Sequence, residues 1–160
     1  MANFINGTQQ RLLHMGLKVE EPAAVLPATA TAHLFTVAGG RVIVTGLVGQ
    51  CTTVCTSTAT TVSVGVTPTS GTASTTGICT ATAVTSAEVG TLVSLPSGAK
   101  GALVVGTGAT AGGAVQVQGP GGYVVEPGTI DITTSATNTG AFKWTLFYIP
   151  LDDGASVTAV

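Results

Sequence analysis

Charged and aromatic side chains are scarce in this sequence. Only 8% of its 160 residues are Asp, Glu, Lys or Arg, and 4% are aromatic, whereas an average globular chain is roughly 25% charged. The five basic residues are scattered along the chain, which excludes a protein that binds nucleic acid through clustered positive charge. A mean hydropathy of +0.54 with a net charge of −2 excludes an intrinsically disordered chain.

Long hydrophobic runs are also missing. Thr, Gly or Ser breaks every apolar run within a few residues, whereas a membrane-spanning helix needs about 20 consecutive apolar residues. The first charge is Arg11, so residues 1–10 lack the basic start of a secretory signal peptide. We therefore expect neither a membrane partner nor an export signal.

Threonine and glycine are abundant, with 29 and 22 residues respectively. Thr and the many Val residues are β-branched, which favours strands over helices, and Gly supplies turns. The sequence therefore predicts an all-β fold, an antiparallel β-sandwich or barrel with an extended N-terminal arm. Because a surface of Thr, Ser and Ala carries little charge repulsion between copies, we also expect a homo-oligomer or a larger assembly.

The predicted arm covers residues 1–28, and the predicted β domain covers residues 29–160. The arm holds four of the twelve charged residues. A short helix is expected over about residues 9–18, although Gly16 interrupts it and no strong N-cap is evident. Two prolines then favour an extended path. The segment is interpreted as an arm that docks on a partner, with a frayed terminus as the alternative.

Two strand-like runs, residues 33–38 and 41–47, flank the pair Gly39-Gly40. A glycine pair suits the positive φ angles of a two-residue turn, so this segment is predicted to be a β-hairpin. Further short strands, spaced by turn residues, are typical of a sandwich or barrel. They are expected at residues 78–85, 91–95, 102–105, 114–118, 123–125 and 129–134. A loop is expected over residues 67–77, and before it Val54, Val62, Val64 and Val66 alternate with polar residues over part of the Thr-rich stretch 48–88.

The final run, residues 141–150, is the most apolar of the chain. Alternation places four side chains on one face of this strand: Phe142, Trp144, Leu146 and Tyr148. Because the opposite face is also largely apolar, the strand is predicted to be central, with the core around Trp144.

Three cysteines are the only candidates for metal or redox chemistry. Cys51 and Cys55 are separated by three residues and Cys79 is distant, which does not match the paired spacing of a zinc site. Buried free thiols are the preferred interpretation. One disulfide plus a free cysteine, or a metal site, remain alternatives.

No motif in the sequence predicts catalysis or a cofactor. The glycine-rich run 106–113 lacks the helix that a dinucleotide loop requires, and Ser97 and Lys100 lack the further motifs of penicillin-recognising enzymes. His33 is expected to be a surface or interface residue at the start of a strand. We therefore predict that the protein is not an enzyme.

Two stretches, residues 33–49 and 128–157, resemble small structural proteins that tailed bacteriophages encode, often near the head genes. The resemblance covers about a third of the chain and implies a virion component without a cofactor. It implies a capsid decoration (cement) protein that is made in the host cytoplasm and binds the major capsid protein on the outer surface of the expanded head. Such proteins are often trimers, so a trimer is expected.

On this interpretation the arm carries the capsid contacts. The candidate apolar anchors are Phe4, Ile5, Leu12, Leu13 and Leu17, and the candidate charge partners are Arg11 and Lys18. Alternatively, these residues cover the core of their own domain. Alternative functions are a head fibre, tail or connector protein, or a carbohydrate-binding or adhesive β-sandwich, which would need an exposed aromatic platform.

Overall fold

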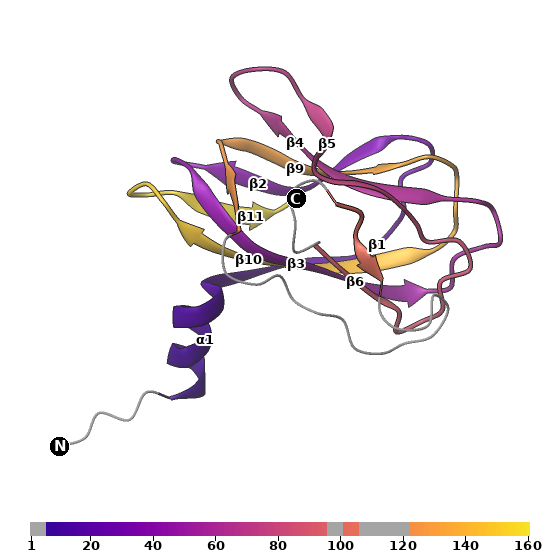
Figure 1. Ribbon diagram of the computed structural model, residues 1–160, viewed down its shortest axis with the longest axis horizontal. Helices are drawn as coiled ribbons and strands as arrows, with labels where there is room; N and C mark the ends of the chain where they lie inside the picture. The colour runs from indigo at the N-terminus through magenta and orange to yellow at the C-terminus, as the bar shows by residue number, and fades with distance from the viewer. Residues whose placement is uncertain (1–5, 96–100, 106–121) are drawn as a thin grey trace.

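A computed structural model describes residues 6–95, 101–105 and 122–160 of the chain. Two antiparallel sheets pack face to face and enclose one hydrophobic core (Figure 1). The all-β prediction is therefore confirmed, in the form of a sandwich. Within the described residues, no helix is long and apolar enough to cross a membrane.

The larger sheet is built around β3 and β10 and contains six strands in the order β1-β10-β3-β6-β7, with β8 also paired to β3. Its strands are β1 (Leu17–Val25), β3 (Val42–Thr53), β6 (Leu92–Ser94), β7 (Val104–Val105), β8 (Tyr123–Val125) and β10 (Ala141–Pro150).

The smaller sheet contains five strands in the order β11-β2-β9-β4-β5. They are β2 (Thr31–Ala38), β4 (Thr61–Pro68), β5 (Ser74–Ala83), β9 (Gly128–Thr134) and β11 (Ser156–Ala159). Most predicted short strands thus have a counterpart, but the loop between β4 and β5 is confined to residues 69–73, shorter than expected. The predicted strand at 114–118 lies outside the described residues.

β10 is an interior strand, as predicted, because it pairs with β1 on one side and β3 on the other. Its four inward side chains, Phe142, Trp144, Leu146 and Tyr148, are all buried. The Phe142 and Trp144 rings stack with centroids 5.8 Å apart. Trp144 lies opposite Gly49 of β3, where a Cβ atom would be only 2.6 Å from the indole Cζ3. The absence of a side chain at Gly49 therefore makes room for the indole.

The structure corrects the extent of the expected arm. Residues 17–25 form β1, an edge strand whose Val19 packs against the core. Pro22 is tolerated because β1 pairs only with β10, and the register shifts between Glu21 and Ala24. The two prolines favour an extended path in the sequence, and the structure places Pro22 in a paired edge strand, whose free side needs no backbone donor. Among the described residues of the expected arm, those outside the strands are residues 6–16, which include α1 (Gly7–Met15), and residues 26–28.

The predicted hairpin at Gly39-Gly40 is wrong. β2 pairs with β9 and β11, while β3 pairs with β10, β6 and β8, so the glycines connect the two sheets. Gly39 has a φ of 76°, and a Cβ atom there would lie 2.3 Å from the carbonyl oxygen of Gly154. Glycine is thus required by a close approach to the β10–β11 turn, which sequence periodicity does not reveal.

An ion pair joins this crossover to the β10–β11 turn. Asp152 Oδ2 accepts hydrogen bonds from the backbone N–H of Arg41 at 2.8 Å and from its Nε at 2.9 Å, and Asp152 Oδ1 accepts from Nη2 at 2.9 Å. The hydrogen bonds from the Arg41 side chain and backbone lower the pKa of the Asp152 carboxyl to about 2. The charged carboxylate therefore stabilises the folded chain.

We predict that the substitution Gly49→Ala destabilises the fold. The added methyl group would meet Trp144 and Val93 within 2.8 Å, and overpacking of this kind costs about 1–3 kcal/mol. Chemical denaturation measures the change. The matched control is Gly7→Ala, where a Cβ atom meets nothing within 4 Å; equal effects of the two substitutions would contradict the packing argument.

The substitution Asp152→Asn tests the ion pair through pH. Because the folded pKa lies below the ordinary value of 3.8, the carboxylate contributes stability above about pH 4 that is lost as the pH falls toward 2. Thermal melting should show the variant slightly less stable than the parent at pH 7 and equal to it near pH 2. A difference independent of pH would exclude the charged form as the cause.

Candidate functional site

The helix α1 (Gly7–Met15) precedes the sandwich and is capped at its N-terminus by Asn6. Asn6 Oδ1 accepts from the Gln9 N–H at 2.9 Å, and Gln9 Oε1 accepts from the Asn6 N–H at 3.0 Å, which completes a capping box. The expectation that the helix lacks a strong N-cap is therefore wrong. The spacing of Asn6 and Gln9 in the sequence is the signal that would have identified the cap.

Gly16 ends the helix and seats it on the larger sheet. Its φ is +82°, its N–H donates to the carbonyl oxygen of Leu12 at 3.1 Å, and a Cβ atom there would lie 2.1 Å from the Tyr148 carbonyl oxygen. The Thr45 hydroxyl of β3 donates to the Met15 carbonyl oxygen. The last turn of α1 is thereby attached to β3 and β10, and the rest of the helix extends outward.

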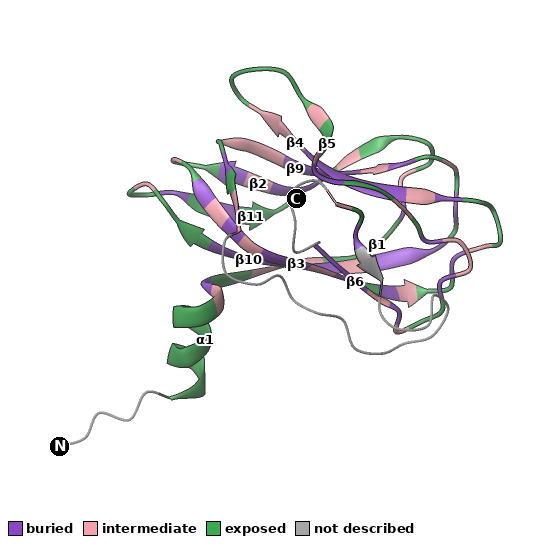
Figure 2. Ribbon diagram, viewed as in Figure 1, coloured by how far each residue is buried: buried purple, intermediate pink, exposed green. Residues whose placement is uncertain are grey.

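No residue of α1 is buried, and the helix projects away from the sandwich (Figure 2). The exposed fractions are 43% for Leu12 and 71% for Leu13. Isolated helices shorter than about 12–15 residues are marginal in water, and most helical stability in proteins comes from packing of an apolar face. A capped nine-residue helix that displays two leucines is therefore suited to packing against a partner.

The predicted contact residues divide between two elements. Arg11, Leu12 and Leu13 lie on α1, whereas Leu17 and Lys18 lie in β1. Phe4 and Ile5 lie outside the described residues. The role of all seven residues in contacting a partner stays a prediction. The alternative, that these residues cover the core of their own domain, does not hold for Leu12 and Leu13, because both are exposed.

Lys18 is engaged on its own sheet. Its Nζ lies 3.2 Å from Glu20 Oε2, and Lys143 Nζ lies 3.0 Å from Glu20 Oε1. Hydrogen bonds from Lys143 and Lys18 lower the pKa of the Glu20 carboxyl. These three exposed side chains link β1 to β10.

A buried carboxylate lies on the outer face of the smaller sheet. Asp131 Oδ1 is 2.7 Å from His33 Nδ1, and Asp131 Oδ2 accepts from the Thr67 hydroxyl at 2.5 Å. The Asp131 side chain is 3% exposed and that of His33 is 55% exposed, so His33 lies at the surface as expected. Thr67 bonds the carboxylate and not the imidazole, so the three groups do not form the nucleophile–histidine–carboxylate order of a hydrolase triad.

A row of threonines crosses the same outer face. Cross-strand pairing places Thr158, Thr36, Thr129 and Thr67 side by side on the neighbouring strands β11, β2, β9 and β4. The side chains next to them along β2 and β9, such as Val37 and Ile130, point into the core. This row is uncharged, and it could not be found from the sequence because it depends on strand order and register.

The three cysteines are free and buried, as predicted. Burial raises the pKa of the Cys55 and Cys79 thiols to about 11 in each case, which makes the reactive thiolate rare at neutral pH. No group of three or more His, Cys, Asp or Glu side chains among the described residues could hold a metal ion.

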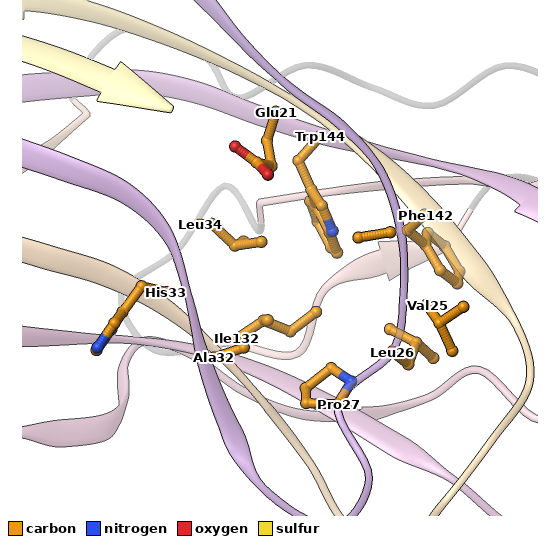
Figure 3. Close-up of a pocket in the computed structure, with 11 residues that line it drawn as sticks. Glu21, Val25, Leu26, Pro27, Ala32, His33, Leu34, Ile132, Phe142 and Trp144 are labelled. Atoms are coloured by element: carbon orange, nitrogen blue, oxygen red, sulfur yellow. The ribbon is translucent and has the colours of Figure 1, made fainter. Parts of the chain in front are cut away.

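Hollows among the described residues include two that are small and largely apolar. One, of about 60 Å³, opens between the sheets beside β1, and Figure 3 shows the His33 ring pointing away from its apolar lining. The other, of about 160 Å³, lies between β8 and the β4–β5 hairpin. Ligand pockets usually enclose roughly 300–1,000 Å³, so neither hollow suits a cofactor. The glycine-rich run 106–113 and the Ser97–Lys100 pair lie outside the described residues.

No protein-family model, no curated protein and no solved structure matches this chain.

We predict that His33→Ala destabilises the fold, because it removes one of two hydrogen bonds from a buried carboxylate. Leaving a buried polar group unsatisfied costs about 1–3 kcal/mol, measured by urea denaturation. In the double variant His33→Ala with Asp131→Asn, the loss should be smaller than the sum of the single losses. Strictly additive losses would show that the two side chains do not interact.

Proposed function

We propose that this chain is a structural protein of a bacteriophage virion, and in particular a capsid decoration protein that docks on the outer surface of the expanded head through α1. The observation that carries the proposal is the helix itself. It is fully capped, attached to the sheet at one end only, and has no buried residue. The major capsid protein is the proposed partner, and the sequence resemblance to phage structural proteins supports this choice.

The low charge of the chain supports the same proposal. A decoration protein packs among identical neighbours, and a chain in which only 8% of the residues are charged allows close packing with little charge repulsion. Contacts made only with the expanded shell would stabilise that shell by linkage, and many weak contacts would add through multivalency. We propose a homo-oligomer, and a trimer in particular, because the decoration proteins that the sequence resembles are often trimers.

The carbohydrate-binding alternative has less support. Such a site needs an exposed aromatic platform, but the aromatic side chains of the described residues are buried or half-buried. Trp144, which offers the largest aromatic surface, is in the core. An adhesive role through a sugar-stacking surface is therefore the weaker proposal.

Leu13→Asp in the full chain is expected to weaken binding to purified expanded heads. Burying a leucine side chain contributes about 1.5–3 kcal/mol, so the dissociation constant should rise by at least about tenfold. A cosedimentation titration with heads that lack the protein measures the constant. The matched control is Val89→Asp, which alters an equally apolar side chain that is 58% exposed and distant in sequence from α1.

The two parts of the proposal fail in different ways. If Leu13→Asp, Val89→Asp and the parent chain bind heads equally well, docking through α1 is wrong. A truncation that removes residues 1–15 retains β1 and provides a second variant, since α1 contributes no buried residue to the sandwich. If mass spectrometry of purified virions finds none of this chain, the virion proposal itself is wrong.

A further inference from the structure

Two of the three cysteines contact the same backbone carbonyl oxygen where β3 ends. Cys51 lies in β3 opposite Phe142 of β10, and a Cβ atom at Gly140 would be 2.3 Å from the sulfur of Cys55. Both cysteines are therefore side by side along the end of β10. Both are also buried, with exposed fractions of 0% for Cys51 and 2% for Cys55.

The backbone on both sides of the pair is held by the loop between β5 and β6. The Cys51 N–H donates to the Thr91 carbonyl oxygen at 2.9 Å, and the Cys51 carbonyl oxygen accepts from the Gly90 N–H at 2.8 Å. The Cys55 N–H donates to the Ala87 carbonyl oxygen at 2.9 Å. These bonds fix the positions of both cysteine backbones relative to a single loop.

The two cysteines meet at one carbonyl oxygen. Cys51 Sγ lies 3.6 Å from the Ala87 carbonyl oxygen, to which the Cys55 N–H donates at 2.9 Å, and Cys51 Sγ also donates to the Thr53 carbonyl oxygen at 3.1 Å. Each cysteine is among the groups that shift the thiol pKa of the other. Cys79 is engaged elsewhere, on β5 of the smaller sheet, where its sulfur accepts from the Val64 N–H at 3.1 Å. The neighbours thus form a specific pair, and the third cysteine is separate from it.

We propose that Cys51 and Cys55 form an intramolecular disulfide when the chain meets a small disulfide oxidant such as oxidised glutathione. One cysteine thiolate attacks a glutathione sulfur, forming a mixed disulfide and releasing one glutathione thiolate. The second cysteine thiolate then attacks the protein sulfur of that mixed disulfide, releasing the second glutathione. The protein loses two thiol protons and two electrons, and the oxidant leaves as two molecules of reduced glutathione.

Burial determines when this bond forms. Desolvation raises the pKa of both thiols, and the thiolate is the attacking species. Oxidation of Cys51 and Cys55 in the folded chain is therefore slow. The disulfide forms while the chain folds, or while the loop between β5 and β6 is displaced from the two cysteines. Once formed, the bond ties the end of β3 to the segment that follows it and is shielded from external reductants. This inference does not depend on the proposed function.

The test refolds the chain from denaturant in a mixture of oxidised and reduced glutathione at about pH 8.5, near the ordinary thiol pKa. The refolded protein is then denatured in the presence of iodoacetamide, which alkylates every free thiol. Mass spectrometry of the intact chain and of its proteolytic fragments counts and locates the alkyl groups. We expect the parent chain to gain one alkyl group, located at Cys79. Cys79→Ala should gain none and lose two hydrogen atoms, whereas Cys51→Ala and Cys55→Ala should each gain two alkyl groups.

Three outcomes would overturn the proposal: three alkyl groups on the parent chain, a disulfide that includes Cys79, or a disulfide between chains. Circular dichroism verifies that each alanine variant folds, and the parent chain gives the result by itself should one of them fail to fold. The oxidised Cys79→Ala protein should also unfold at a higher urea concentration than its reduced form, because the crosslink restricts the unfolded chain.

Discussion

The packing of the Trp144 indole on Gly49 is the contact on which the rest of the structure depends. It lies where β3 and β10, the two longest neighbours of the larger sheet, face the core. β10 pairs with β3 on one side and β1 on the other. Its inward aromatic side chains belong to the core between the two sheets. Three of the four buried aromatic side chains among the described residues, Phe142, Trp144 and Tyr148, come from this one strand.

The same strand determines the position of α1. Gly16 lies against the Tyr148 carbonyl oxygen at the end of β10, and no residue with a side chain could approach the backbone so closely. The helix therefore starts from a rigid base while its leucines stay in solvent. A rigid base and an unpacked helix are the combination that a docking segment requires, since the helix is directed outward before any partner is present.

Several features were predictable from residues alone. β-branched composition identified the fold class, alternation in residues 141–150 identified the buried face of β10, and cysteine spacing identified free thiols. Other features depended on contacts distant in sequence. The Gly39-Gly40 pair matched a hairpin locally, but β11 and β9 occupy both sides of β2, so β3 joined the other sheet. The prolines of residues 17–28 suggested an arm, because periodicity cannot distinguish an edge strand from an unpaired segment.

The sequence by itself determined that the chain forms a weakly charged all-β domain, a sandwich or a barrel, with Trp144 in its core, because strand propensity and apolar alternation are local properties. Only the tertiary structure decided which strands are neighbours. That choice aligned four threonines across one sheet face and left α1 with no buried residue. The physical reason is that strand pairing joins backbones far apart in the chain, and the free energy of those contacts depends on side chains from both partners.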